Sequence, residues 1–327
     1  MMIRRPRRNR KSAVIRELVE ETTLSVRDLI FPIFLIEGDN QAVAIDSMPG
    51  MYRYSPDRLL DEIGACAELG IRTFDVFPSL PESKKDRRAT EGTNPEGLYL
   101  STLRKIKEHY PDVCVMTDVA MDPYSSDGHD GLVQDGKILN DETLEILGNM
   151  AVAQAEAGAD ILGPSDMMDG RVGYMRQQLD AAGFTDVSIM SYTAKYASAF
   201  YNPFRDALDS APKFGDKKTY QMNPANRREA LLEAELDFEE GADMLMVKPA
   251  LFYLDIIRDL SEAFPIPIAA YNVSGEYAMT KAAAAQGWLD GERIMLESLL
   301  SIKRAGAKII LTYFAKEYAQ GVKEGRW

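Results

Sequence analysis

Long hydrophobic runs and cysteines are scarce in this 327-residue chain. No apolar stretch approaches the roughly 20 residues that span a bilayer, and the best candidate, residues 29–36, contains Pro32. Cys66 and Cys114 form neither a CxxC nor a zinc-like pair. The basic N-terminus has no apolar stretch behind it, so no secretory signal is expected. These absences exclude a membrane protein and a disulfide scaffold, and they predict a cytoplasmic location.

Basic residues are fewer than acidic ones, and they are unevenly distributed along the chain. Lys and Arg number 38 against 51 Asp and Glu, a net charge of −13, yet residues 1–11 hold six cations and no acid. Such a basic run is typical of a nucleic-acid-binding arm or of an arm that packs on an acidic neighbouring subunit. An acidic body repels phosphate backbones, which favours the second interpretation, so no nucleic-acid partner is expected.

Short apolar runs alternate with amphipathic segments of helical period along the rest of the chain. A short helix is predicted first, over residues 12–22, with Ser12 as its N-cap. The predicted strands are residues 30–35, 73–77, 113–119, 161–164, 187–192, 244–248, 268–273 and 309–313. The predicted helices between and after them are residues 55–69, 94–109, 141–157, 168–182, 226–240, 253–263, 275–286 and 291–305.

Eight strand–helix repeats favour a (β/α)₈ TIM barrel of the α/β class. Glycines after the predicted helices, at Gly70, Gly158, Gly241 and Gly306, supply the left-handed cap that turns the chain into the next strand. No G-x-G-x-x-G follows a strand, which argues against a dinucleotide fold, and no organic cofactor is expected. No linker divides the chain, so we expect an N-terminal arm and short helix over residues 1–25 and one catalytic barrel over residues 26–327.

Lysines at the ends of two consecutive strands are the sharpest chemical signal. Lys248 closes an apolar strand, and Lys195 follows the strand before it. Barrel active sites lie at the carboxyl ends of the strands. Burial and a neighbouring ammonium both lower the pKa of a lysine, and a neutral amine attacks a ketone to form a Schiff base. A single such lysine more often pairs with a carboxylate or reaches solvent, but a pair favours chemistry.

The loop after the third strand is rich in aspartate. Asp118, Asp122, Asp127 and Asp130 are candidate ligands for a divalent cation, and His129 is a further candidate. Carboxylate oxygens suit Mg²⁺ better than Zn²⁺, and the loop has no cysteine. On spacing alone, a turn cluster in a mobile loop explains these residues equally well.

A long loop, residues 201–221, follows the fifth strand. Long structured loops over a barrel mouth are often lids. Arg205 and Lys217 are candidate clamps for a substrate carboxylate. Solvated surface charge is the plainer alternative for both.

With these residues in hand, the sequence resembles the porphobilinogen synthase family, also called 5-aminolevulinate dehydratase. The resemblance runs over essentially the whole chain. It rests on residues 5–8 (RPRR), 31–34 (FPIF), 47–50 (SMPG), 191–198 (SYTAKYAS), 200–207 (FYNPFRDA), 246–250 (MVKPA) and 271–277 (YNVSGEY). The resemblance implies a (β/α)₈ lyase that condenses two 5-aminolevulinate molecules into porphobilinogen, with loss of two waters, for haem or chlorophyll biosynthesis.

The resemblance also assigns roles to residues. Lys248 and Lys195 are the implied Schiff-base lysines, one for each substrate. Ser274 and Tyr313 are implied to hold one substrate carboxylate. Arg205, Lys217 and Gln221 are implied to hold the other, although Lys217 replaces an arginine and lacks its fork. The remaining implied pocket residues are Asp118, Ser165, Tyr201 and Tyr271.

The sequence departs from the zinc-dependent branch of that family. The three cysteine positions of the loop are Ala120, Asp122 and Asp130 here, so no zinc is expected and the resemblance is to the magnesium-type branch. It implies an allosteric Mg²⁺ at Glu233, with Asp122 and Asp130 as candidates for a second metal. It also implies a homo-octamer built through the N-terminal arms.

Two other functions stay open at this stage. Another Schiff-base barrel lyase, of the class I aldolase kind, needs only one lysine. An RNA-binding or scaffold protein that uses residues 1–11 ranks last, because the rest of the chain is acidic.

Overall fold

A closed parallel barrel forms the body of the protein in this computed structural model, which describes residues 2–208 and 212–327. Eight barrel strands pair in the order β1-β4-β5-β8-β9-β10-β11-β12 among these residues, and β12 pairs back onto β1. Their bounds are β1 Leu29–Leu35, β4 Thr73–Pro78, β5 Cys114–Val119, β8 Ile161–Pro164, β9 Ser188–Lys195, β10 Met244–Lys248, β11 Ile268–Asn272 and β12 Ile309–Thr312. The (β/α)₈ expectation is confirmed.

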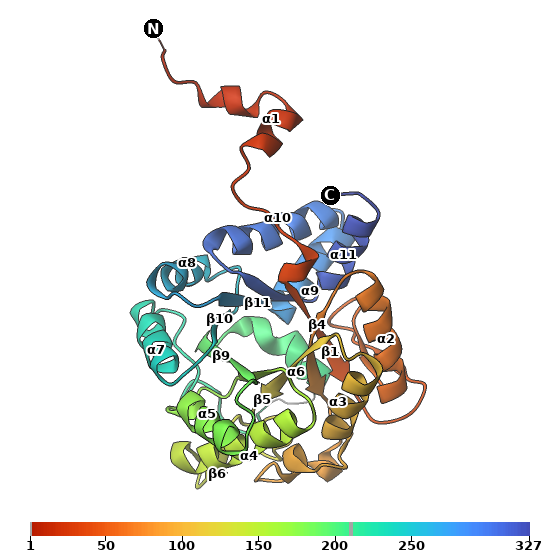
Figure 1. The fold of residues 1–327 in the computed structure, drawn as a ribbon, viewed down its shortest axis with the longest axis vertical. Helices are drawn as coiled ribbons and strands as arrows, with labels where there is room; N and C mark the ends of the chain where they lie inside the picture. The colour runs from red at the N-terminus through yellow and green to blue at the C-terminus, as the bar shows by residue number, and fades with distance from the viewer. Residues whose placement is uncertain (1, 209–211) are drawn as a thin grey trace.

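Helices surround the strands in the ribbon view, with the arm projecting from one side (Figure 1). The helices that follow the barrel strands are α2 Pro56–Glu68, α3 Leu98–His109, α4 Asn140–Glu156, α5 Arg171–Ala181, α7 Arg228–Glu239, α8 Leu254–Ala263, α9 Ser274–Ala285, α10 Gly291–Ala305 and α11 Ala315–Lys323. Most strand residues are buried because the helices cover the outside and side chains fill the inside.

Glycine ends the helices where the sequence predicts it. Gly70, Gly158, Gly241 and Gly306 have φ values of 92°, 98°, 100° and 123°. These backbone angles favour glycine, so each turn brings the chain back to the barrel at once. The expected strand over 187–192 instead continues to Lys195, because β9 keeps pairing with β10 up to that residue.

Several elements were not predicted from the sequence. Hairpin strands β2 (Ala42–Ala44) and β3 (Tyr52–Tyr54) extend the sheet at β1, and β6 (Leu132–Gln134) pairs with β7 (Lys137–Leu139). The loop expected as a lid over 201–221 contains a helix, α6 (Asn202–Leu208), while its residues 209–211 lie outside the described residues. These pieces are too short to show a period in the sequence.

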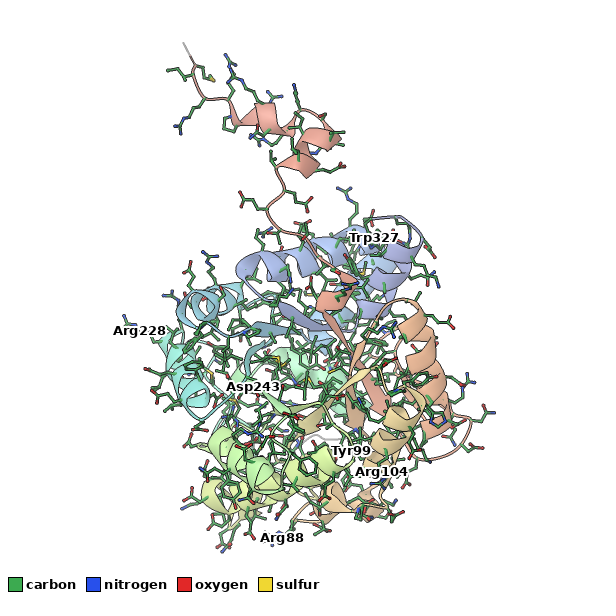
Figure 2. All side chains as sticks on the ribbon, in the orientation of Figure 1. Arg88, Tyr99, Arg104, Arg228, Asp243 and Trp327 are labelled. Carbon is green, nitrogen blue, oxygen red and sulfur yellow. The ribbon has the colours of Figure 1, made fainter. Side chains whose placement is uncertain are left out.

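The N-terminal arm projects away from the barrel (Figures 1 and 2). Residues 2–14 are all exposed. Helix α1 spans Ala13–Leu18, shorter than predicted, and the Ser12 hydroxyl caps it by accepting from the Ile15 amide. A helix without a packing partner gains little stability, which explains its early end. No helix among residues 2–208 and 212–327 is long and apolar enough to cross a bilayer.

Candidate active site

The two predicted lysines meet at the carboxyl ends of adjacent strands. Lys195 ends β9, Lys248 ends β10, and the two are register partners in the sheet. Neighbouring strands lie about 4.8 Å apart. Both side chains are nearly inaccessible, with 6% and 5% of their surfaces exposed. The structure therefore brings two amines together in one buried site.

Aromatic rings surround the amine of Lys248. Its Nζ lies 4.4 Å from the ring centre of Tyr271, 5.0 Å from those of Tyr192 and Phe204, and 5.5 Å from that of Tyr201. The Tyr201 hydroxyl donates to the Lys248 carbonyl at 3.1 Å, which holds this part of the lid on the strand end. Aromatic faces attract an ammonium, but they solvate it less well than water does.

Burial and the neighbouring ammonium of Lys195 lower the pKa of Lys248 to about 7. The carboxyl groups of Asp118, Asp75 and Asp122 act in the opposite direction without cancelling this effect. A large share of Lys248 is therefore the free amine near neutral pH, which is the form that attacks a carbonyl carbon.

Polar groups contact the amine of Lys195. Its amine donates to the Ser165 carbonyl and lies 3.6 Å from Asp130 Oδ2. Ser165 follows β8, and its side-chain hydrogen bond to Asp118 lowers the pKa of that carboxyl, although burial and Asp122 together raise it to about 6. Asp118 thus gains or loses a proton more easily at neutral pH than an ordinary aspartate.

Lys217 joins the two candidate metal ligands of the loop. Its amine lies 3.1 Å from Asp122 Oδ2 and 2.8 Å from Asp130 Oδ1, and all three side chains are buried. Burial raises the pKa of Asp130, but Lys195 and Lys217 outweigh it and hold the pKa at about 2. Burial and then Asp130 raise the pKa of Asp122.

Asp122 and Asp130, the candidate ligands for a second metal, are not arranged to hold one. The Lys217 ammonium stands where a cation bridging Asp122 and Asp130 would bind. Within the described part of the chain, no group of three or more His, Cys, Asp or Glu side chains is arranged to hold a metal ion. The spacing of these residues in the sequence does not reveal that a lysine about 90 positions away supplies the positive charge.

The residues expected to hold one carboxylate lie near Lys248, on and after the strands β11 and β12. The hydroxyls of Tyr271 and Tyr313 are 2.9 Å apart on β11 and just after β12. Ser274 Oγ accepts from the Phe204 amide at 3.0 Å and donates to the Phe200 carbonyl at 3.3 Å. Ser274 therefore fastens the start of the lid over the lysine.

The residues expected to hold the other carboxylate are more dispersed. The Arg205 side chain is partly exposed on α6 and donates to Asn202 Oδ1 at 3.5 Å. Gln221 is buried, and its backbone N–H donates to the Lys217 carbonyl at 2.9 Å. The Lys217 ammonium already forms ion pairs with two aspartates. A substrate carboxylate would have to bind Lys217 in addition to them.

Glu233 lies apart from the lysines, on α7 outside the barrel. It lines a cavity of about 890 Å³ together with Asp169, Glu229 and Gln221. Burial raises the pKa of Glu233 to about 7, and Asp237 and Asp169 add to this while Arg171 opposes it. An acidic cluster of this kind favours the approach of a cation.

A buried ion pair supports the strand that carries Lys195. The Asp237 carboxylate accepts from the hydroxyls of Ser191 and Thr193 at 2.6 and 2.8 Å, and from Arg171 at 3.1 Å. Ser191 and Thr193 belong to β9, Asp237 to α7 and Arg171 to α5. The network fixes β9 between two helices and thereby limits the movement of Lys195.

Three residues of the site escaped the sequence analysis: Asp75, Tyr192 and Phe204. Tyr192 and Phe204 stand in segments that were recognised, but spacing does not show that their rings face Lys248. Asp75 carried a usable signal, because it interrupts a strand, residues 73–78, that is otherwise buried and mostly apolar.

The comparisons with known proteins agree over nearly the full length. Residues 3–321 match the model of the family described as delta-aminolevulinic acid dehydratase. The chloroplastic delta-aminolevulinic acid dehydratase of Oryza sativa is 57% identical over 97% of this chain and 75% of its own length. The Bradyrhizobium diazoefficiens enzyme is 53% identical over 98% of this chain and 91% of its own.

A solved structure agrees in fold. It is the porphobilinogen synthase of Toxoplasma gondii with the reaction product porphobilinogen, which is 51% identical to this chain. The two superpose with a TM-score of 0.96 over 98% of this chain and 91% of the other.

One expectation is contradicted by these relatives. The sequence predicted a cytoplasmic location, but the plant relatives, at 56–57% identity, are chloroplastic by name. The prediction was wrong because a low cysteine count does not distinguish the cytoplasm from the interior of an organelle. Sequence and structure nevertheless agree on descent, and this chain belongs to the delta-aminolevulinic acid dehydratase family.

Proposed function

We propose that this protein condenses two molecules of 5-aminolevulinate into porphobilinogen, with the release of two waters. The observation that carries the proposal is the pair of buried lysines in register at the ends of β9 and β10. Two ketone substrates require two amines if each is held as an imine. Membership of the family supports the same reaction.

Lys248 acts as the first nucleophile in this proposal. Its free amine attacks the ketone carbon of one substrate, and loss of water from the adduct gives the protonated imine. The aromatic rings around Lys248 exclude bulk water, which protects the imine from hydrolysis. Burial keeps the amine unprotonated before the attack.

Lys195 binds the second substrate, and the acids around it move protons. The pKa of Asp118 is raised to about 6, and the charges of Lys195 and Lys248 both act on this carboxyl group. Asp118 therefore suits general acid–base catalysis at neutral pH. The Ser165 carbonyl aims the Lys195 amine. Asp130 keeps its negative charge and balances the cations of Lys195 and Lys217.

The two substrate carboxylates need separate partners. In this proposal Ser274 and Tyr313 bind one carboxylate beside Lys248, and the contact between the hydroxyls of Tyr271 and Tyr313 supports the role of Tyr313. Arg205, Lys217 and Gln221 bind the other carboxylate in this proposal. Arg205 has the bidentate geometry for a carboxylate and is held by the lid helix α6.

A colorimetric pyrrole assay tests the reaction directly. Purified protein is incubated with 5-aminolevulinate, and porphobilinogen is expected to accumulate. The same assay is repeated after EDTA treatment and after addition of Mg²⁺ or Zn²⁺. Absence of the pyrrole under every one of these conditions contradicts the proposal.

We also propose that the protein belongs to the magnesium-type branch and binds an allosteric Mg²⁺ at Glu233. Oxygen ligands suit this cation, which usually keeps several waters and takes one or two carboxylates. Glu233 fits because it faces a roomy cavity with Asp169 and Glu229 nearby. When bound there, the cation supplies positive charge outside the barrel.

Glu233→Gln is expected to abolish stimulation by Mg²⁺ and to weaken Mg²⁺ binding about tenfold or more, because a carboxylate ligand is lost. Activity measured without added metal should change little, since Glu233 lies on helix α7 and not at the strand ends that carry the lysines. Calorimetric titration and the pyrrole assay give the two readouts. Glu235→Gln serves as the control, because Glu235 is an exposed acid on the same helix and does not line this cavity. Equal Mg²⁺ affinity in the Glu233 variant and the unmodified protein would refute the site.

The arm is proposed to join copies of the chain into a homo-octamer. Its exposed cations complement the acidic body, and residues 2–14 are all exposed in the single chain. Deletion of residues 2–11 is expected to reduce the mass in solution from about eight copies to two or fewer. Light scattering coupled to size exclusion measures this mass. An unchanged mass after the deletion contradicts the role of the arm.

A further inference from the structure

One buried carboxyl group inside the barrel belongs to none of the roles assigned so far. Asp75 lies on β4, and its side chain is fully buried. It is level with Met116 on the neighbouring strand β5, so it lies two residues deeper in the barrel than Asp118. A carboxyl group at this depth needs a reason, because burial of an acid is costly unless it is neutral or paired.

The hydrogen bonding of Asp75 is incomplete. Its Oδ2 accepts from the Tyr192 hydroxyl at 3.4 Å, and its Oδ1 is buried without a hydrogen-bond partner. A purely structural aspartate would normally satisfy both oxygens. The Asp75 side chain therefore has one long hydrogen bond, to Tyr192, and it interacts with Asp118 and Lys248 through their charges.

Tyr192 stands between Asp75 and the two lysines. Its hydroxyl contacts Asp75, while its ring centre lies 5.0 Å from the Lys248 amine and 6.0 Å from the Lys195 amine. Tyr192 also meets Tyr271 edge to face, with ring centres 6.4 Å apart. The side chain of Tyr192 thus contacts both Asp75 and Lys248.

We propose that Asp75 is a positioning residue that acts on Lys248 across Tyr192, and that its ionisable carboxyl group sets how readily the Lys248 amine takes up a proton. The inference rests on the proposed function in one respect: Lys248 must react as a free amine. It goes beyond that function by assigning a role to Asp75, which lies deeper in the barrel than Asp118.

The electrostatics agree with this geometry. Burial and then Asp118 raise the pKa of Asp75 well above its usual value, while Lys248 and Tyr192 oppose the rise. Asp75 is therefore mostly neutral when Lys248 is a free amine, and it ionises more easily once Lys248 carries a positive charge. The charged or titratable groups that face it are Asp118, Lys248, Tyr99, Tyr192, Tyr271 and Tyr313.

The direction of the effect follows from the charges. A proton on Lys248 is stabilised by a nearby carboxyl group that can become negative. Asparagine keeps an oxygen for the Tyr192 hydroxyl but never becomes charged, so Asp75→Asn removes only this stabilisation. The amine is then harder to protonate, and its pKa falls.

Chemical labelling measures this pKa without any substrate. Acetic anhydride reacts with the free amine, and mass spectrometry of the Lys248 peptide gives the extent of labelling at each pH. We expect the midpoint to fall by about 0.5–1 pH unit in Asp75→Asn, a threefold to tenfold change in the protonation equilibrium. The acidic limb of kcat/KM should move by the same amount.

Two further variants make the test decisive. Asp75→Leu removes the same charge in an apolar form and should shift the midpoint in the same direction. Asp28→Asn is the matched control, because Asp28 is a buried acid beside Lys303 and Lys308 at the start of β1. It should leave the midpoint unchanged. A folded Asp75→Asn or Asp75→Leu protein that labels with the midpoint of the unmodified protein overturns the inference.

Failure of the inference and failure of the proposed function are distinguishable. The labelling midpoint reports on Lys248 whether or not 5-aminolevulinate is the substrate. If unmodified protein makes no porphobilinogen but Asp75→Asn lowers the midpoint, the electrostatic inference stands and the proposed function falls. If porphobilinogen forms normally and the midpoint does not move, only the inference falls.

Discussion

Lys248→Met is expected to abolish porphobilinogen formation, with a fall in kcat of about 10⁴-fold or more. The side chain supplies the nucleophilic amine, and removal of a nucleophile commonly costs this much. Methionine fills a similar volume among the rings of Tyr192, Tyr201, Phe204 and Tyr271 without burying an amine. The fold should therefore survive, and the pyrrole assay measures the loss.

Lys303→Met is the matched control for this variant. Lys303 is also a largely buried lysine, but it contacts Asp28 and the Lys308 carbonyl at the start of the barrel strands. Its loss should leave kcat within about twofold of the unmodified protein. Substantial porphobilinogen formation by a folded Lys248→Met protein would remove this lysine from the mechanism.

Lys195→Met is expected to stop product formation while leaving Lys248 able to bind one substrate. The loss in kcat should be about 10³-fold or more, because the second substrate loses its covalent anchor. Borohydride should still trap 5-aminolevulinate on Lys248. Asp130 keeps Lys217 as a partner, so the buried acid is not left alone.

The same variant has a second readout in its pH dependence. In the unmodified protein, trapping on Lys248 should rise with pH through about 7, where the amine loses its proton. The Lys195 ammonium helps to lower the pKa of Lys248, so its removal should move this rise to higher pH. Full activity in Lys195→Met would favour a one-lysine lyase of the class I aldolase kind instead.

The barrel was predictable because its signal repeats. Apolar strands and amphipathic helices recur eight times, and glycine ends several of the helices, so an error at one boundary does not change the architecture. Short pieces without a period were missed, such as α6 and the hairpin of β2 and β3. The end of β9 was also misplaced, since pairing with β10 rather than local composition carries the strand to Lys195.

The site was predictable only in its outline. The proximity of Lys195 and Lys248 was predictable, because both follow strands of a parallel barrel and the carboxyl ends of such strands meet at the same rim. It did not show that Lys217 neutralises Asp122 and Asp130, since that contact joins segments far apart in the chain. Nor did it show Asp75, whose meaning depends on the depth of a side chain inside the barrel.

Peptide mapping of unmodified protein trapped with borohydride in the presence of 5-aminolevulinate tests the central claim most directly. The claim is that two neighbouring amines in one buried site each hold a substrate as an imine. Mass spectrometry should find the reduced adduct on the peptide of Lys248 and, at high substrate concentration, also on the peptide of Lys195. Adducts on other lysines alone, or no adduct in protein that makes porphobilinogen, would contradict it.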